Sequence, residues 1–161
     1  VFPSNTTAEQ LLEQKPDGIM LSPGPGDPEL LEYTVESVRG LLGRVPIMGI
    51  CLGNQVLARA LGAKTYKLKF GHRGANHPVQ DISTGRVYIT AQNHGYSIDP
   101  ESLPSEVEVS HISMNDNTVE GIRHKSLPAM SIQYHSEASP GPKDNEYIFN
   151  RFLDMVRESK S

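Results

Sequence analysis

The first half of the sequence alternates short apolar runs with segments of helical spacing, and this alternation most constrains the fold. The runs DGIMLS and PIMGI, at residues 17–22 and 46–50, are typical of buried strands, and VFPS at residues 1–4 is typical of a short strand remnant. Helical patterns follow at residues 7–14, 30–42 and 55–61. Strand and helix in alternation predict an α/β domain with a mostly parallel, open sheet flanked by helices.

The second half has a different pattern, with short strand-like runs close together. They occupy residues 65–70, 86–92, 107–114, 118–124 and 129–135. Asn115, Asp116 and Asn117 are turn residues between two of these runs, so we expect a hairpin there. An amphipathic helix is predicted at residues 146–157. We therefore expect additional antiparallel strands in this half, within one domain spanning residues 1–161.

Composition excludes several classes of protein. The chain has 161 residues and a formal net charge of −4, so it has no overall basic attraction to nucleic acid or anionic lipid. Its single cysteine excludes an internal disulfide and a cysteine-based zinc cluster. It contains no apolar run long enough to span a bilayer and no signal-peptide pattern. These features predict a cytoplasmic protein without nucleic-acid or membrane partners.

The single cysteine, Cys51, lies between a predicted strand and a predicted helix in the pattern Gly49-x-Cys51-x-Gly53. This is the pattern of a nucleophile elbow, in which small flanking residues allow close backbone approach and the side chain stands out from the sheet. The following helix directs its free N–H groups and positive dipole end at the sulfur, which favours the thiolate. The alternative is an inert cysteine packed in the core, and the motif alone leaves both open.

A thiol nucleophile also needs a base and a group that orients the base. His135 follows an apolar run, at the carboxyl end of a predicted strand where α/β sheets gather their sites. Glu137 is two residues further on and faces the same side in an extended chain, so its carboxylate can reach the imidazole. The two residues can also be a strand-end histidine beside a solvated acid. With Cys51 they would form a Cys-His-Glu triad.

The remaining histidines have simpler interpretations. We expect His111 and His124 to be surface or edge residues in the hairpin arms. His72 and His77 lie in the predicted loop GHRGANHP without an acidic residue or thiol beside them. We assign these two a structural role and predict no metal site.

The segment SPGPGDP, at residues 22–28, is predicted to be a loop stiffened by its prolines. The N–H of Gly24 is then a preorganised donor of the kind that stabilises an oxyanion, and the N–H of Leu52 is a second. The alternative is a rigid turn that caps a helix at Asp27. A phosphate-binding loop is disfavoured because no lysine follows as in a P-loop.

Five motifs carry a resemblance to a known family over nearly the whole chain: LSPGPGDP, GICLGNQ, FGHRGANHPV, AQNHGYS and QYHSEASPGP. In this order they resemble the glutaminase domain of class I, or triad-type, glutamine amidotransferases. The last three motifs lean toward the branch that serves carbamoyl-phosphate synthetase, as its small subunit. The anthranilate and GMP synthase branches share the elbow and stay open as alternatives.

The resemblance implies a role for each matching residue. Cys51 is the nucleophile toward the carboxamide of glutamine, His135 moves the protons, and Glu137 orients His135. The backbone N–H groups of Leu52 and Gly24 form the oxyanion hole. The residues implied to bind glutamine or shape its pocket are Gly24, Gly26, Leu52, Gln55, Asn93, Gly95 and Tyr96.

The resemblance also implies partners. Ammonia passes to a large synthetase subunit or domain that uses ATP, Mg²⁺ and bicarbonate for carbamoyl phosphate formation, in arginine and pyrimidine biosynthesis. No cofactor and no metal is expected in this chain. Two other interpretations remain: a cysteine hydrolase of another amide or a peptide, and a non-catalytic docking or regulatory module of the same fold.

The start of the chain departs from the family pattern. Val1 matches the family's second strand, so the resemblance implies that the first strand and helix of the domain are missing and that the domain is N-terminally truncated. We expect the loss to leave a gap or an unpaired edge in the sheet. The 161 residues would then carry the catalytic machinery without being a complete working unit.

Overall fold

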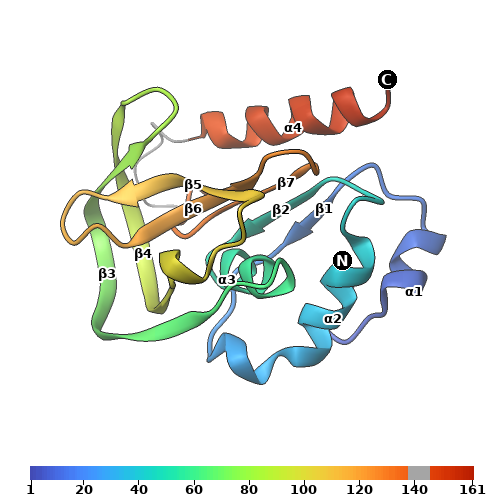
Figure 1. Cartoon of the computed structure of the whole chain (residues 1–161), viewed down its shortest axis with the longest axis horizontal. Coiled ribbons are helices and arrows are strands. Elements are labelled where there is room, and N and C mark those ends of the chain that lie inside the picture. The colour runs from blue at the N-terminus through green and yellow to red at the C-terminus, as the bar shows by residue number, and fades with distance from the viewer. Residues whose placement is uncertain (138–145) are drawn as a thin grey trace.

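The computed structural model describes residues 1–137 and 146–161. In these residues the chain forms one mixed sheet of seven strands, in the order β1-β2-β7-β6-β5-β3-β4 (Figure 1). The predicted α/β class, with parallel strands first and antiparallel strands in the second half, is confirmed. Antiparallel pairs outnumber parallel ones, because only β1–β2 and β2–β7 are parallel.

The parallel part contains β1 (Ile19–Leu21), β2 (Ile47–Ile50) and β7 (Ala129–Ile132). All four residues of β2 are buried, as expected for a strand covered on both faces. The strand expected to be buried at residues 17–22 is instead the short edge strand β1, and Met20 is 48% exposed. Its outer edge has no strand partner among the described residues.

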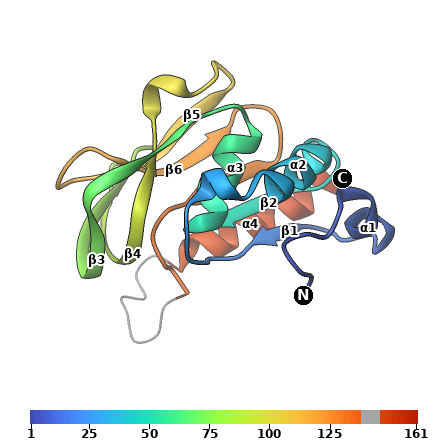
Figure 2. The same ribbon diagram turned by 90° about the horizontal axis from the view of Figure 1, so that it is seen from below.

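The antiparallel part contains β3 (Thr65–Asp81), β4 (Val87–Ile98), β5 (Val107–Ser113) and β6 (Val119–His124). The long β3–β4 hairpin extends on the side of the molecule opposite α1 (Figure 2). GHRGANHP was expected to be a loop, but it continues β3. Positive φ angles at Gly71 and Gly74, together with register shifts, let the strand bend there without ending.

Helices cover both faces of the sheet (Figure 1). The bounds are Ala8–Glu13 for α1, Glu32–Leu41 for α2, Leu52–Ala60 for α3 and Tyr147–Ser159 for α4. The first three pack on one face with Ile47 and Ala129. Helix α4 packs on the other face, where Ile148 and Phe152 contact the side of β2 that carries Met48. Alternate residues of β2 therefore belong to different cores.

Two boundaries differ from prediction. Residues 1–4 are not a strand: Pro3 lacks an N–H for a ladder, and its carbonyl accepts from the N–H of Thr6 in a turn. Helix α3 begins at Leu52, earlier than expected, because helical geometry starts directly after the turn at Cys51. The hairpin at residues 115–117 is confirmed, with Asn117 at a φ of 59°. No helix in the described ranges is long and apolar enough to cross a membrane.

Candidate active site

Cys51 occupies the single-residue junction between β2 and α3. Its backbone has φ 54° and ψ −107°, a conformation that L-residues rarely adopt. It is held in place by its N–H, which donates to the carbonyl oxygen of Ile132 on β7 at 2.9 Å, and by its carbonyl, which accepts from the N–H of Asn54 at 3.1 Å. Strained backbone at the first residue of a helix is the geometry of a nucleophile elbow.

The glycines on either side of Cys51 are required by close backbone contacts. A Cβ atom at Gly49 would lie 2.3 Å from the carbonyl oxygen of Gly53. A Cβ atom at Gly53 would lie 2.2 Å from the carbonyl oxygen of Leu21, at the end of β1. The predicted reason for the small residues, close passage of neighbouring backbone, is therefore confirmed.

The sheet brings His135 to Cys51 from the far end of the sequence. Strand β7 lies beside β2, and the chain beyond it is tied to β4 where the N–H of His135 donates to the carbonyl oxygen of Ala91 at 2.9 Å. His135 Nδ1 lies 2.8 Å from Glu137 Oε1. The contact expected between these two residues is present, although they lie in the turn after β7 rather than on the strand itself.

The electrostatics of the three residues are coupled. The Cys51 thiol and the Glu137 carboxylate raise the pKa of His135 to about 10, against the effect of burial. Burial raises the pKa of Glu137, but the hydrogen bond with His135, a backbone hydrogen bond and the charge of His135 together outweigh burial, so that this pKa lies below its usual value. A charged imidazole between a thiol and a carboxylate can stabilise a thiolate and can deliver a proton to a leaving group.

The loop at residues 22–27 lies over the start of α3. A Cβ atom at Gly24 would lie 3.0 Å from Leu52 Cδ2, so the backbone of the loop at Gly24 lies against the side chain of Leu52. The end of the loop is capped: Asp27 Oδ1 accepts from the N–H of Glu29 at 2.9 Å and starts the 3-10 helix η1 (Pro28–Leu30). The capping role considered for Asp27 is therefore present as well.

The residues expected at the glutamine pocket come from this loop, α3 and β4. Gln55 is 2% exposed, and its Nε2 donates to the carbonyl oxygen of Tyr96 and to Gln133 Oε1, both at 3.0 Å. The carbonyl oxygen of Asn93 lies 3.8 Å from Cys51 Sγ. Burial and the nearby Asp27 carboxylate raise the pKa of Tyr96.

Gly95 and Gly26 leave space at this position. A Cβ atom at either glycine would meet nothing within 4 Å, and Gly26 has a φ of 105°. The two glycines therefore border open space.

Comparison with known proteins decides the family. Residues 1–155 match the family model of the class I glutamine amidotransferases. The chain belongs to the class I glutamine amidotransferase family. Among curated relatives of this amidotransferase chain, the carbamoyl phosphate synthase small chain of Staphylococcus saprophyticus is 56% identical over 162 residues, covering 100% of this chain and 44% of that protein.

Other relatives agree. The pyrimidine-specific small chain of Bacillus subtilis carbamoyl phosphate synthase is 54% identical over 160 residues, covering 99% of this chain and 44% of that protein. The crystal structure of a putative GMP synthase component from Thermoplasma acidophilum has the same fold, with a TM-score of 0.80 and 25% identity over 99% of this chain and 81% of that one. The amidotransferase chain thus spans less than half the length of its curated relatives.

Sequence reasoning missed a buried polar ladder behind the elbow. Ser131 Oγ donates to Asn54 Oδ1 at 2.8 Å, and Asn54 Nδ2 donates to Gln133 Oε1 at 3.0 Å, next to the bond from Gln55. Ser131, Gln133 and Asn54 are fully buried. The ladder fixes α3 of the amidotransferase to β7. The signal was available, since Ser131 and Gln133 are polar residues in the otherwise apolar run AMSIQY.

Two expectations about the other histidines are wrong. His111 is not a surface residue: it is 1% exposed, burial lowers its pKa to about 4, and its Nε2 lies 2.9 Å from the Tyr147 hydroxyl on α4. His72 does have carboxylates nearby, because the β5–β6 hairpin brings Asp116 Oδ2 to 2.7 Å and Glu120 Oε1 to 3.4 Å. Both contacts join residues far apart in the sequence.

Proposed function

We propose that this chain hydrolyses L-glutamine to glutamate and ammonia through Cys51, His135 and Glu137. The observation that carries the proposal is the strained turn that presents Cys51 beside the hydrogen-bonded pair of His135 and Glu137. An amide needs a strong nucleophile and a protonated leaving group, and these three residues supply both. Membership of the amidotransferase family supports the same reaction.

The reaction proceeds in two halves. His135 accepts the thiol proton, and the Cys51 thiolate forms a bond to the carboxamide carbon. The N–H groups of Gly24 and Leu52 stabilise the resulting oxyanion. The carbon–nitrogen bond breaks as His135 returns the proton to the departing ammonia, which leaves a glutamyl thioester. His135 then activates water, which releases glutamate and restores the thiol, while Glu137 keeps the imidazole oriented.

The substrate is held on the side of Cys51 that faces the loop and β4. We assign binding or shaping of the glutamine pocket to seven residues: Gly24, Gly26, Leu52, Gln55, Asn93, Gly95 and Tyr96. Gln55 shapes the pocket indirectly, because its amide donates to the Tyr96 carbonyl and so positions this part of β4. The side chains of Asn93 and Tyr96 are available on β4, and the two glycines leave room for the ligand backbone.

The ammonia serves a large synthetase subunit or domain that makes carbamoyl phosphate from bicarbonate and ATP with Mg²⁺. Support comes from the relatives at 54–57% identity, which are carbamoyl phosphate synthase small chains. The domain at residues 1–161 would act in the cytoplasm in pyrimidine or arginine biosynthesis, and we assign no cofactor of its own to the hydrolysis. The likeness to a GMP synthase component supports a second candidate, but its identity is only 25%.

Ammonia release from glutamine tests the proposal. We expect the wild-type chain to release ammonia, either alone or in the presence of a carbamoyl-phosphate synthetase large subunit, and we expect Cys51→Ser and His135→Gln to lose it. His77→Gln is the matched histidine control, because among the described residues the His77 ring bonds the carbonyl oxygen of Arg73 and packs against His72, not against the triad. A glutamine-derived diazo-ketone should label Cys51. Equal ammonia release by Cys51→Ser, with the fold intact, would overturn the proposal.

The large subunit used in the assay distinguishes the branches. The carbamoyl-phosphate assignment predicts that a carbamoyl-phosphate synthetase large subunit stimulates glutamine hydrolysis and that the synthetase domain of GMP synthase does not. Ammonia-dependent synthesis by the assembled enzyme should survive Cys51→Ser, because the thiol acts only in ammonia release. Stimulation by the GMP synthase partner alone would favour the second candidate. Hydrolysis of other amides in preference to glutamine would favour a general cysteine hydrolase.

A further inference from the structure

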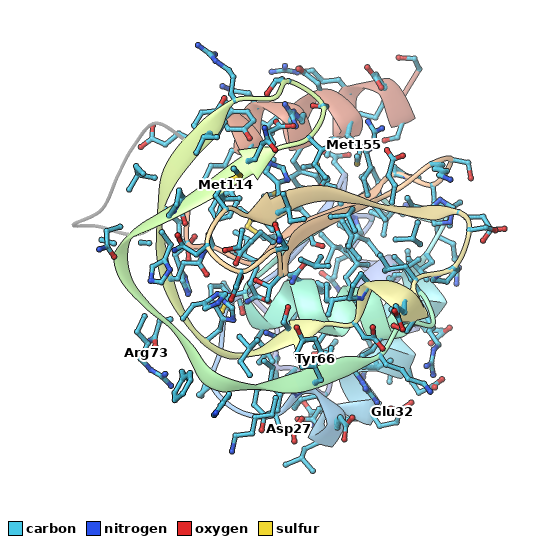
Figure 3. All side chains as sticks on the ribbon, turned by 60° about the vertical axis from the view of Figure 1, so that its left-hand side comes forward. Asp27, Glu32, Tyr66, Arg73, Met114 and Met155 are labelled. Atoms are coloured by element: carbon cyan, nitrogen blue, oxygen red, sulfur yellow. The ribbon has the colours of Figure 1, made fainter. Side chains whose placement is uncertain are left out.

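A second cluster of chemically active side chains lies apart from the proposed triad. It contains His72 on β3, His94 on β4 and Glu120 on β6, which are 8%, 7% and 0% exposed. His72 and His94 are directly opposite each other in the β3–β4 ladder. One nitrogen or oxygen atom from each residue lies within 4.8 Å of the other two. Arg73, next to His72, points away from the molecule (Figure 3), so the alternation of the strand turns His72 inward.

The two imidazoles are oriented by acceptors on their outer sides. His72 Nε2 lies 2.7 Å from Asp116 Oδ2, and His94 Nδ1 lies 2.8 Å from the carbonyl oxygen of Tyr96. A carboxylate and a carbonyl oxygen can only accept, so each of these nitrogens carries the ring proton. In the neutral rings, the inner nitrogens, His72 Nδ1 and His94 Nε2, then each carry a lone pair. An outer acceptor that fixes the tautomer is the usual arrangement around metal-binding histidines.

The atoms that face these lone pairs are acceptors too. His72 Nδ1 lies 3.4 Å from Glu120 Oε1, and within the described ranges both atoms are buried without a hydrogen-bond partner. His94 Nε2 lies 2.6 Å from Gln92 Oε1. The Gln92 amide cannot simply be turned over, because its Nε2 donates to Glu120 Oε2 at 3.0 Å. Four acceptor atoms therefore converge with no donor among them.

Two positive charges would neutralise the cluster, because the carboxylates of Glu120 and Asp116 supply two negative charges. Two protons placed on the ring nitrogens would make both rings imidazolium, and their centroids are 4.8 Å apart in a buried site, where like charges repel strongly. One divalent ion supplies the same charge and satisfies all four inner acceptors, while the outer hydrogen bonds stay as they are. The hydrogen-bond pattern thus favours the ion.

We propose that His72, His94 and Glu120, with the Gln92 carbonyl oxygen as fourth ligand, bind one zinc-type divalent ion. Two imidazoles and a carboxylate are a ligand set that suits Zn²⁺. Ligand bonds of about 2.0–2.1 Å in a tetrahedron place ligand atoms about 3.3 Å apart. The separation of His72 Nδ1 and Glu120 Oε1, 3.4 Å, fits this spacing, whereas His94 Nε2 and Gln92 Oε1, at 2.6 Å, would move apart when the ion binds.

The ion would have a structural effect on the proposed active site. His94 lies between Asn93 and Gly95, which border the glutamine pocket, so a bound ion would fix this part of β4 to β3 and β6. The inference concerns this cluster alone and stands or falls independently of glutamine hydrolysis.

Metal binding by the purified, tag-free chain in a Cys51→Ser background tests the proposal, since that background removes the thiol as a competing ligand. Zn²⁺ and Co²⁺ are the probes, with metal content measured after dialysis and Co²⁺ followed by its visible absorption. We expect one equivalent per chain and a higher Tm in the presence of Zn²⁺. His72→Gln and Glu120→Gln should weaken binding at least tenfold, and His77→Gln should leave it unchanged.

Asp116→Asn is the second variant, because Asp116 orients His72 without touching the ion and its side chain is 42% exposed. Loss of such an outer partner weakens metal affinity by about 10–100-fold. Circular dichroism checks that each variant is folded. Absence of stoichiometric binding by the folded Cys51→Ser chain would overturn the proposal. Equal affinity in His72→Gln and His77→Gln would overturn it as well.

Discussion

Gly53 on α3 lies against the carbonyl oxygen of Leu21 at the end of β1, so closely that a Cβ atom would be 2.2 Å from it. Both partners are backbone, and neither can rotate away. We expect Gly53→Ala to lower the free energy of unfolding by about 2–3 kcal/mol, measured by urea denaturation. Gly95→Ala is the control, since its Cβ would meet nothing within 4 Å, and it should change stability by less than about 1 kcal/mol. Equal losses would show that the contact is not the cause.

The pairing of His135 with Cys51 and Glu137 makes stability depend on pH. The pKa of His135 is raised from 6.5 to about 10 in the folded chain, so the charged form is favoured by folding. Its contribution is fully present below pH 6.5 and is lost as the pH rises toward 10. Urea denaturation at several pH values should show that wild-type stability relative to His135→Gln decreases over this interval. A constant difference between the two proteins would contradict the pairing.

Asp81 fixes α4 to the end of β3. This fully buried carboxylate accepts from Arg151 Nη2 at 2.8 Å and from the Tyr147 hydroxyl at 3.0 Å. Asp81→Asn removes the charge from both bonds, and we expect a loss of about 2–3 kcal/mol in unfolding experiments. The matched control is Asp154→Asn, whose exposed pair with Arg157 should contribute less than about 1 kcal/mol. Similar losses for the two variants would mean that the burial of Asp81 does not increase the contribution of its bonds to stability.

Gln55 connects α3 to β4 and to β7. Gln55→Leu removes the bonds to the Tyr96 carbonyl and to Gln133, which leaves that carbonyl without the amide donor. Because Tyr96 is assigned to the glutamine pocket, we expect KM for glutamine to rise more than kcat falls. Gln80→Leu is the control, since Gln80 bonds only the carbonyl oxygen of Gly85 through its side chain, in the β3–β4 turn. A fall in kcat with KM unchanged would show that Gln55 does not act through the pocket.

Local patterns predicted much of the fold and the elbow. The turn at Cys51 could be recognised because its cause is local: two glycines, a preceding apolar strand and a following helix. The turn at Asn117 was visible for the same reason. The contact between His135 and Glu137 was predictable because Glu137 is only two positions further along the chain. These features depend on backbone conformation within a few residues.

The features that sequence reasoning missed join distant segments. His111 and Tyr147 meet across the interface between β5 and α4, and His72 meets Glu120 only because the β5–β6 hairpin folds toward β3. Contacts between such distant segments leave no periodic pattern in the sequence. GHRGANHP was taken for a loop because glycine and proline usually end a strand, but here the bends are absorbed within β3.

Strand β7 lies third in the sheet, between β2 and β6, although it is the last of the described strands along the sequence. During synthesis on the ribosome, β2 and β6 therefore wait with open edges until residues 129–132 emerge. Insertion of β7 closes the sheet and delivers His135 to Cys51 in the same event. Pairing of the Cys51 thiol with the His135 imidazole would thus report closure of the sheet, and partly made chains would be the form most exposed to aggregation through those edges.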